Sequence, residues 1–397
     1  MFYQIYSEEV KANDLLLQST FMDFIPKIAF DFPGIVFLVF CFVVLVQLLF
    51  LFLVNFRLLK HKPKEKLQKL PPVTVIICAR NEEDNLFKNL PLILGQDYPD
   101  FEVIVVNDQS VDDSRHIIQA FQKKYTNLRL IEMEKNKHRR FGKKVPLTVG
   151  IKGAKYDKLA FTDADCQPRS KQWLKHLVAN YTEGKEIVIG YGAYEKQKGF
   201  LNKFIRFDTT SIAANYLGAA KLGRPYMAVG RNMSYLKETF FKVDGFRKHY
   251  HIQSGDDDLF MQDTAERRNV AIELHPESFV YSTPKTSWGD WIRQKQRHYT
   301  TAGEYRLINK LFLGIFPASM LLMLVSLVIL LFNYQWWAFV LAVFGLRILL
   351  YWLINGLLFK KLEMGDLVAL YPFYELMHFC VMPFIFYSTK GGQSSKW

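Results

Sequence analysis

The sequence predicts an α/β domain built on a mostly parallel sheet, with one N-terminal and two to three C-terminal transmembrane helices. Half of the residues are hydrophobic and the mean hydropathy is near zero, which is high for a purely soluble enzyme. The apolar residues gather near the N-terminus and after Lys310. Between them, short β-branched strands alternate with helical stretches, a pattern typical of parallel sheets covered on both faces.

The first apolar run, Gly34 to Val54, is long enough to cross a hydrocarbon core of ~30 Å as a helix. A cleaved signal peptide fits poorly, because the run begins late and no small-residue cleavage site follows it. The stretch Arg57–Lys66 after it is strongly basic, whereas most charged residues of the N-terminal flank are acidic. By the positive-inside rule, the N-terminus faces outward and the basic side faces the cytoplasm.

The middle of the chain carries the strand and helix alternation. Ligands of such sheets bind beyond the carboxyl ends of the strands, so polar residues that follow a strand are the candidates for a site. The expected strands are Val73–Ala79, Glu102–Asn107, Leu128–Met133, Leu159–Thr162 and Glu186–Gly190. The expected helices are Asp84–Leu94, Asp112–Lys124 and Lys144–Ala154.

The last third of the chain returns to the membrane. Two apolar segments there are long enough to span, and a third contains two prolines and ionisable residues, so it either spans or is re-entrant. These three segments are Leu311–Phe332, Trp336–Phe359 and Leu367–Tyr387. The predicted organisation is an extracytoplasmic segment 1–33, a transmembrane helix 34–54, a basic linker 55–71, the α/β domain 72–286, an amphipathic interfacial helix 287–310 and a C-terminal transmembrane region 311–397.

The net charge of +13 leaves three classes of partner: nucleic acid, an anionic membrane surface and phosphate-bearing substrates. No zinc-finger spacing, RNA-binding aromatic signature or basic DNA-binding helix is present, so a nucleic acid is not predicted. The four cysteines are divided between expected membrane spans and the expected cytosolic domain, so no disulfide framework is predicted.

Polar residues follow the first two expected strands. Ala79, Asn81 and Glu82 close the first strand and can line a nucleotide pocket, or Asn81 can cap the helix that follows. Asp108 follows the second strand and can accept a hydrogen bond from a pyrimidine imide or a ribose hydroxyl. Ser110 or Asp112 can instead cap the next helix, and both interpretations can hold together.

Carboxylates gather at two further places. Asp163 and Asp165 end a hydrophobic strand and can coordinate one divalent ion, although a bare Asp-x-Asp is usually polar surface. The position at a strand end favours a site. The run Asp256–Asp258 can supply a general base whose pKa its neighbours raise, or it can open a helix capped by Ser254.

Basic and amide side chains complete the candidates. Gln294 and Arg297 share one face of the expected helix, and Arg297 can offset charge on a departing diphosphate. The alternative is an ordinary interfacial helix with Trp and Arg at the lipid headgroups. Lys143, in the basic run Lys135–Lys144, can also reach a phosphate, although charge runs are more often solvated.

Taken in order, these elements resemble the family 2 inverting glycosyltransferases with the GT-A fold. The resemblance covers about Pro72 to Tyr299 and the general membrane layout, and it rests on the order of the motifs rather than on any one of them. The motifs are Ala79-Arg-Asn-Glu82, Asn107-Asp-Gln-Ser-Val-Asp112, Gly142-Lys143, Asp163-Ala-Asp165, Val229-Gly-Arg-Asn232, Val243-Asp-Gly-Phe246, Gly255-Asp-Asp257 and Gln294-Lys-Gln-Arg-His298.

The resemblance implies a donor site. Asp108 would contact the uridine of a UDP-sugar, Asp163 the sugar-diphosphate region, and Asp165 a Mg²⁺ or Mn²⁺ ion on the diphosphate. Asn107 stands where the family usually has a first acidic residue, which is tolerable if Asp108 does the binding. The implied nucleotide-sugar contacts are Ala79, Asn81, Glu82, Asp108, Lys143, Asp163 and Asp165.

The resemblance also implies the reacting groups. Asp257 would deprotonate the acceptor hydroxyl if the chain is aligned on Gly-Asp-Asp, whereas another register makes Asp256 the base. Gln294 and Arg297 would close over the donor and stabilise the leaving diphosphate. The closing motif ends in His298 instead of the Trp that helps polymerising members to seat the growing acceptor, which weakens a polymerase interpretation.

The low number of spans is more similar to ceramide glucosyltransferases than to polysaccharide synthases that build an export channel. The leading hypothesis is transfer of one sugar from a UDP-sugar to a lipid or lipid-linked acceptor at the cytoplasmic face of a bacterial inner (plasma) membrane. Ionisable side chains are costly inside a bilayer. We therefore expect Arg347, Glu375 and His378 either to pair with residues of neighbouring helices or to contact an acceptor head group. The alternatives are a processive β-glycan synthase and a non-catalytic nucleotide-sugar-binding membrane protein.

Overall fold

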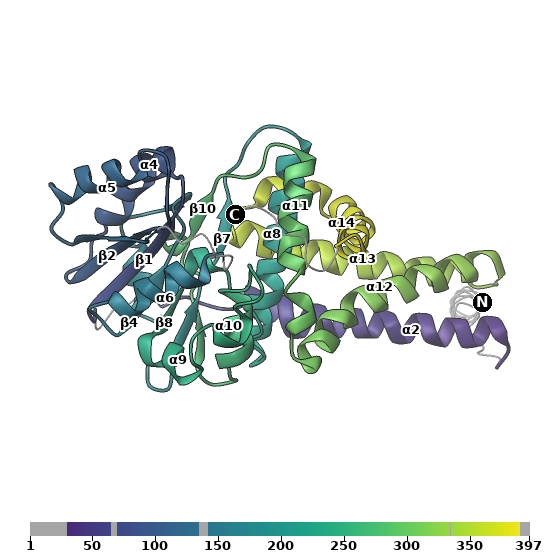
Figure 1. The fold of residues 1–397 in the computed structure, drawn as a ribbon. Coiled ribbons are helices and arrows are strands. Elements are labelled where there is room, and N and C mark those ends of the chain that lie inside the picture. Colours follow the sequence, from purple (N-terminus) through teal and green to yellow (C-terminus); the bar gives the residue numbers. More distant parts are fainter. Residues whose placement is uncertain (1–29, 65–69, 135–141, 334, 390–397) are drawn as a thin grey trace, which may run out of the picture. The chain divides into compact units, whose positions relative to one another are not determined.

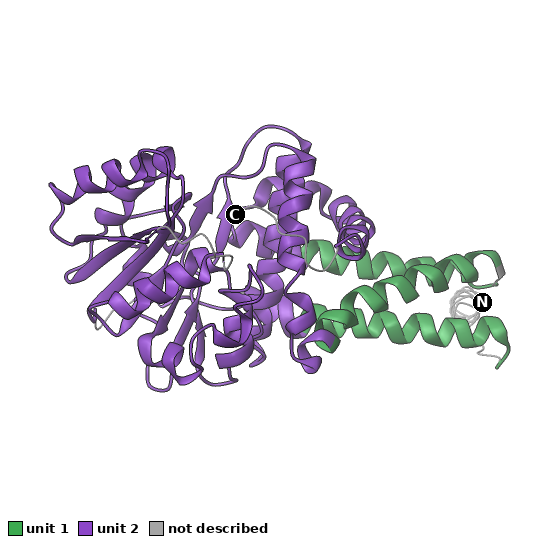
Figure 2. Ribbon diagram, in the orientation of Figure 1, with its two compact units in different colours: residues 1–52, 311–353 green, residues 53–310, 354–397 purple. Residues whose placement is uncertain are grey.

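The computed structural model describes residues 30–64, 70–134, 142–333 and 335–389. Most of the predicted extracytoplasmic segment 1–33 and of the basic run Lys135–Lys144 therefore lies outside the described residues, as does the end of the stretch Arg57–Lys66. The chain divides into two compact units, one of residues 1–52 with 311–353 and one of residues 53–310 with 354–397 (Figure 2).

The larger unit is built on the predicted mostly parallel sheet (Figure 1). The strand order is β3-β2-β1-β4-β8-β6-β9, and β8 runs antiparallel to both of its neighbours while the other pairs are parallel. These strands are β1 (Val73–Ala79), β2 (Phe101–Asn107), β3 (Leu128–Glu132), β4 (Lys158–Phe161), β6 (Ile187–Ile189), β8 (Met233–Leu236) and β9 (Val270–Ile272). A second sheet holds β5 (Cys166–Pro168), β10 (Val280–Ser282) and β7 (Gly192–Tyr194).

Helices bury both faces of the central strands, which explains why every residue of β1 is buried. On one face, Gly150 of α6 lets that helix approach closely, because a Cβ at this position would lie 2.8 Å from the Ile76 side chain. The opposite face packs against apolar residues of other helices, Leu90 and Trp173 among them. The helices of this unit are α4 (Glu83–Leu94), α5 (Ser114–Gln122), α6 (Lys144–Gly153), α7 (Trp173–Val178), α8 (Phe200–Lys221), α9 (Lys237–Lys242), α10 (Asp258–Thr264) and α11 (Trp288–Tyr299).

Two predicted helix caps are wrong. Asn81 does not cap α4; its backbone is left-handed, at φ 56°, and its Oδ1 accepts from the Val111 N–H at 2.8 Å. Ser254 does not cap α10, because the chain turns at Gly255 and the N-cap position falls on Asp257, whose side chain accepts from the Asp258 N–H. In both cases a contact with a distant loop or a glycine turn overrides the local capping preference.

Four helices in the described residues are long and apolar enough to cross a membrane, one N-terminal and three C-terminal. The segment Leu367–Tyr387, whose path the sequence left open, belongs to the fourth. In the smaller unit, the Arg347 guanidinium bonds to Gln47 and lies 3.8 Å from the Tyr351 ring centroid, so its charge is paired within the helices. The elements are α2 (Phe32–Phe50), η1 (Leu51–Phe56), α3 (Arg57–Leu59), α12 (Leu307–Asn333), α13 (Trp337–Lys361), η6 (Gly365–Leu370) and α14 (Tyr371–Tyr387).

Candidate active site

The carboxyl ends of β1, β2 and β4 bring the first candidates to one edge of the sheet. Ala79 contributes its carbonyl oxygen, which accepts from the Asp108 N–H at 2.7 Å and places this buried carboxylate beside the first strand. Asp163 follows β4, which pairs with β1 on its other side. Burial raises the pKa of the Cys78 thiol in β1, and the charges of Asp256, Asp163 and Asp108 raise it further, so all three carboxylates lie near the end of this strand.

The turn after β1 and the loop after β2 are tied to each other. The Asn81 N–H donates to Ser110 Oγ at 2.9 Å, and the Glu82 N–H donates to Ser114 Oγ at 2.9 Å. Gln109, like Asn81, has a left-handed backbone, at φ 58°, a conformation that non-glycine residues seldom adopt outside constrained sites. Asn81 and Glu82 therefore frame the sheet edge next to Asp108, which is the place that the sequence predicted for a nucleotide pocket.

Lys143 joins the two acidic motifs. Its ammonium forms a hydrogen-bonded ion pair with Asp163, and it lies 4.0 Å from the Asp256 carboxylate. Burial opposes the charge of Lys143, but Asp163 and Asp256 outweigh it and raise the pKa of the lysine. The same pairing lowers the pKa of Asp163 although its burial acts in the other direction. The structure thus brings together three residues that lie far apart in the sequence.

Asp163 and Asp165 form a group with Cys166 whose possible ligand atoms lie within 4.8 Å of one another. Burial and the neighbouring Asp163 charge raise the pKa of Asp165, which means that the second carboxylate lacks sufficient positive charge. Burial and both carboxylates also raise the pKa of the Cys166 thiol, so this group stays protonated and is a poor ligand. The two carboxylates offer hard oxygen ligands of the kind that Mg²⁺ and Mn²⁺ prefer.

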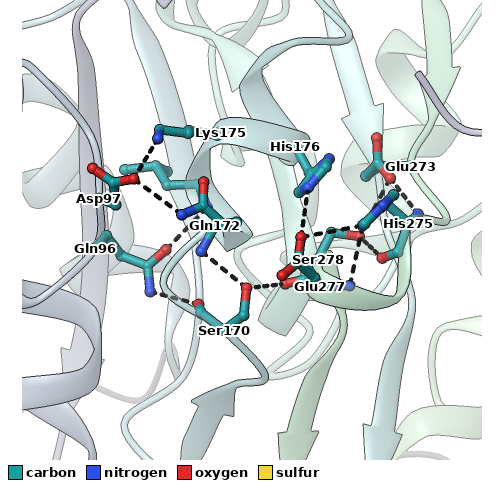
Figure 3. Close-up of polar contacts among 11 residues, drawn as sticks. Gln96, Asp97, Ser170, Gln172, Lys175, His176, Glu273, His275, Glu277 and Ser278 are labelled. Atoms are coloured by element: carbon teal, nitrogen blue, oxygen red, sulfur yellow. Dashed lines mark hydrogen bonds and ion pairs between the residues drawn. The ribbon is translucent and has the colours of Figure 1, made fainter. Parts of the chain in front are cut away.

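A second group of possible ligands, His176, His275 and Glu277, does not have the geometry of a metal site. The two imidazole rings stack with centroids 3.8 Å apart and planes within 8°. Their in-plane lone pairs therefore lie in two nearly parallel planes and cannot both point at one ion about 2.0–2.1 Å from each nitrogen. Figure 3 shows these residues in the polar contacts between α7 and η4 (Pro276–Ser278), where His176 Nε2 lies 3.3 Å from Glu277 Oε2. We assign this group to packing.

The three consecutive aspartates have different surroundings. Asp258 is buried and accepts from Thr301 Oγ1 at 2.5 Å and from the Tyr305 hydroxyl at 2.8 Å, so it anchors α10. Asp257 accepts two backbone N–H bonds, from Gly230 and from Asp258, each at 2.8 Å. Burial and the two flanking carboxylates raise the pKa of Asp257 to about 7. Asp256 lies 4.0 Å from the Lys143 ammonium, which also pairs with Asp163.

Sequence reasoning missed Lys144, which organises the loop before these aspartates. Its side chain is fully buried, and its ammonium donates to the carbonyl oxygens of His249 at 2.7 Å, Ile252 at 2.8 Å and Ser254 at 2.6 Å. Burial lowers the pKa of Lys144 to about 8. The Gly-Lys-Lys sequence was visible, but nothing local to it indicates that the second lysine turns inward.

Helix α11 carries the last two predicted residues. Gln294 Nε2 donates to the Tyr194 hydroxyl at 3.1 Å, and the Arg231 guanidinium lies 4.8 Å from the centroid of the same ring. Arg231 and Arg297 both lower the pKa of Asp163, so positive charge reaches the acidic pair from two elements. Tyr194 and Arg231 were not predicted as site residues.

An ion pair that the sequence did not reveal fixes α11. The Lys295 ammonium donates to Asp208 Oδ2 at 2.8 Å, and His378 Nε2 lies 3.0 Å from Asp208 Oδ1. The Lys295 and Asp208 side chains are only 8 % and 2 % exposed. This anchor lies directly beside Gln294 in the sequence and one helical turn from His298, so it controls how α11 presents its polar face.

Comparisons with known proteins place these features in a family. The model described as "Glycosyl transferase family 2" matches residues 74–242, and the model "Glycosyl transferase family group 2" matches residues 170–360. The chain is 26% identical over 247 residues to "Probable glycosyltransferase YdaM" of Bacillus subtilis, covering 59% of this chain and 56% of the relative. It is 37% identical over 125 residues to "Glycosyltransferase AglE" of Haloferax volcanii, covering 30% of this chain and 39% of the relative. The chain thus spans just over half or less of these relatives' lengths.

Among solved structures, the chain is similar to a mannosyltransferase from Pyrobaculum calidifontis, which was solved in complex with GDP-Man and Mn²⁺. The TM-score is 0.53, the sequence identity is 17%, and the match covers 88% of this chain and 99% of the other. At this identity, the similarity establishes a shared fold, the GT-A arrangement of a mostly parallel sheet.

Proposed function

Because the chain belongs to glycosyl transferase family 2, we propose that it is a metal-dependent inverting glycosyltransferase that transfers one sugar from a UDP-sugar to a hydroxyl of a lipid or lipid-linked acceptor. The observation that carries this proposal is the meeting of Asp163, Asp165 and Asp256 with Lys143 at the carboxyl edge of the sheet. Pure binding of a nucleotide sugar would not need a further carboxylate beside the diphosphate site.

The donor would lie along the strand ends. Asp108 is proposed to accept from the uracil or ribose, and Asp163 and Asp165 to hold Mg²⁺ or Mn²⁺, which would neutralise the diphosphate when bound. The burial of Asp108 and the framing of its loop by Asn81 and Glu82 support a preformed pocket. Lys143, Arg231 and Arg297 supply fixed positive charge to the leaving UDP.

Inversion requires the acceptor oxygen to attack the anomeric carbon from the side opposite the leaving group. A carboxylate takes the hydroxyl proton while the new C–O bond forms, and the bond from the anomeric carbon to UDP breaks with its electrons staying on the diphosphate. We propose Asp256 as this base. Its carboxylate lies 4.0 Å from the Lys143 ammonium that also pairs with Asp163, whereas both oxygens of Asp257 already accept backbone N–H bonds.

Asp257 is the alternative base. Its pKa of about 7 suits a general base at neutral pH, but its two backbone bonds give it the geometry of a helix cap. The two assignments predict different effects of substitution. Asp257→Asn keeps an amide oxygen for one of the two N–H bonds and loses the acceptor of the other. An asparagine at position 256 retains the size of the side chain and removes the base.

The membrane arrangement that we propose places the sugar-transfer domain in the cytoplasm of a bacterial cell, at the inner membrane. Basic residues follow the first candidate span, among them Arg57 and Lys60, and Lys360 and Lys361 end the third. The positive-inside rule orients both ends toward the cytoplasm. A lipid acceptor would then reach the domain from the same leaflet.

The decisive experiment measures UDP release by the purified protein in lipid nanodiscs, over a panel of UDP-sugars with Mn²⁺ or Mg²⁺. Release from one donor that disappears with EDTA and in Asp165→Asn would support the metal-dependent enzyme. Asp256→Asn is expected to lower release at least about 100-fold with donor binding retained, since general-base catalysis is worth about 10²–10⁴-fold. Asp113→Asn, an exposed carboxylate on the same domain, is the matched control and should not change release.

The outcomes separate the candidate functions. A larger loss in Asp257→Asn than in Asp256→Asn would transfer the role of base to Asp257. Long polymer made by the protein alone would replace the single-transfer proposal with a processive β-glycan synthase. Donor binding without release, with every acceptor supplied, would indicate a non-catalytic nucleotide-sugar-binding protein.

A further inference from the structure

A cavity of about 350 Å³ lies beside the candidate active site, within the larger unit. Sequence reasoning singled out none of the residues that line it. Its volume falls in the range of about 300–1,000 Å³ that is typical of small-molecule sites. The lining residues used below are Tyr194 of β7, Lys196, Arg206 of α8, Tyr281 of β10, and Glu363 and Asp366 of the turn between α13 and η6.

The charges in this cavity already neutralise one another. Arg206 binds Asp366 with two hydrogen bonds, of 2.8 and 2.7 Å, and Lys196 lies 3.3 Å from the same carboxylate. Glu363 accepts from the Tyr281 hydroxyl at 2.5 Å and pairs with Arg169. A phosphate or another anion would have to displace one of these carboxylates, so the lining disfavours a charged ligand.

The same groups suit hydroxyl ligands. Each carboxylate keeps further lone pairs that can accept from a hydroxyl, and the tyrosines add ring faces and hydroxyl groups. Arg206 is 2 % exposed and its two terminal nitrogens bind Asp366, so it holds this carboxylate in place at the cavity. Carboxylates that accept from hydroxyls, beside aromatic rings, can therefore hold an uncharged polyol.

The glutamate in the lining occupies an unusual backbone position. Glu363 follows the end of α13 with φ 63°, and the Met364 N–H closes the helix by donating to the Phe359 carbonyl at 2.8 Å. Glycine is the usual residue at such a helix end, because L side chains disfavour this conformation. A glutamate that is held there despite the strain points to a role for its side chain.

The cavity lies between the candidate membrane spans and the residues proposed to take part in the reaction. Its turn joins α13 to η6, and these elements belong to two candidate membrane spans. On the other side, Tyr194 lines the cavity while its hydroxyl accepts from Gln294 and its ring contacts Arg231. Gly230, which precedes Arg231, donates its N–H to Asp257. One side chain therefore separates the cavity from the groups assigned to the donor.

From these contacts, we propose that the cavity binds the uncharged, hydroxyl-rich head group of the acceptor lipid, a glycerol or a sugar. This inference rests on the proposed function and specifies its acceptor. The head group would lie where α13 ends, with its acyl chains among the apolar helices, and Glu363 would accept from one of its hydroxyls. Tyr194 would position the head group next to Gln294.

The test compares acceptors and variants in one assay. UDP release is measured with the preferred donor, first without acceptor, where water accepts the sugar, and then with dioleoylglycerol, monoglucosyl-dioleoylglycerol or undecaprenyl phosphate in the nanodiscs. The variants are Glu363→Gln, which keeps the size of the side chain, and Glu363→Gly, which removes it and suits the left-handed backbone. Glu238→Gln, an exposed carboxylate of α9, is the matched control.

The two neutral lipids are expected to stimulate release, and undecaprenyl phosphate is not. Both Glu363 variants are expected to raise the KM for the neutral acceptor about tenfold or more, as for loss of a hydrogen bond to a charged group, with donor KM and acceptor-free release within twofold. An unchanged acceptor KM in folded Glu363→Gly, or stimulation by undecaprenyl phosphate alone, would overturn this inference and leave the proposed transferase intact. Absence of release under every condition would refute the transferase itself.

Discussion

The buried ion pair between Asp208 and Lys295 gives a prediction with a defined size. Asp208→Asn removes the carboxylate and leaves the Lys295 ammonium buried without a counter-charge. Although burial would raise it, Lys295 and His378 lower the pKa of Asp208 to about 2, which shows how strongly the folded state favours this charge. Breaking a buried pair by removing one partner costs about 3–5 kcal/mol.

That cost corresponds to a fall in melting temperature of about 6–20 °C, at about 2–4 °C per kcal/mol for a domain of this size. Lys295→Met is expected to cost less, because His378 still lies 3.0 Å from Asp208 and can carry the counter-charge. The double variant Asp208→Leu/Lys295→Met leaves no buried charge of this pair, so it should recover much of the loss. UDP release should still fall in all three, because α11, which carries Gln294 and Arg297, loses its buried anchor.

Differential scanning fluorimetry in nanodiscs and the UDP assay check this prediction together. The matched control is the exposed pair of Asp290 and Arg293 on the same helix, whose side chains are 48 % and 68 % exposed. Removing Asp290 should change stability by no more than about 1 kcal/mol. The reasoning is wrong if Asp208→Asn melts within the range of this control, or if the double variant is no more stable than Asp208→Asn.

Three further predictions follow from the same site. Lys144 has a pKa of about 8, and its ammonium loses one of its three N–H donors when it deprotonates. UDP release should therefore fall as the pH rises above about 8, and Lys144→Met should release UDP slowly at every pH. A flat profile from pH 7 to 9 would contradict this. The folded state raises the pKa of Asp257 from 3.8 to about 7, so it favours the protonated carboxyl, and wild-type stability should decline as the pH rises from about 4 to 7. Asp257→Asn should lack this decline in melting scans. Melting temperatures of the two proteins that fall in parallel with pH would contradict the prediction. Gly150→Ala places a Cβ 2.8 Å from Ile76 and should destabilise the sheet by about 1–3 kcal/mol in melting scans. Gly345→Ala, at a helical glycine with no atom within 4 Å of its added Cβ, controls for the change in helix propensity alone.

Much of the fold could be predicted from the sequence. The continuous apolar run of β1 predicted a strand buried on both faces, and its bounds, Val73–Ala79, are those observed. The membrane helices were also visible, because a stretch of about 20 apolar residues leaves a signal that does not depend on distant contacts. The spacing of the strands then placed Asp108 and Asp163 at one edge of the sheet, since parallel strands end on the same side.

The errors occurred where a local preference competed with a distant partner. Asn81 has the chemistry of a helix cap, but the loop after β2 supplies the Val111 N–H that its side chain accepts from. The sequence could not rank the three aspartates either, because identical neighbouring side chains give no periodic signal. Their roles differ only through Gly230, Thr301 and Tyr305, which come from other parts of the chain.

The sequence by itself therefore determined the α/β class, the candidate membrane spans and the set of carboxylates available for chemistry, because strand and helix periodicity and strand-end placement are local properties. Only the tertiary structure decided which charges meet. Lys144 reaches a carbonyl oxygen 110 residues away, Lys295 finds Asp208 across 87 residues, and Arg206 finds Asp366 across 160. Such pairs form because a buried charge needs a partner, and packing alone selects which partner is within reach.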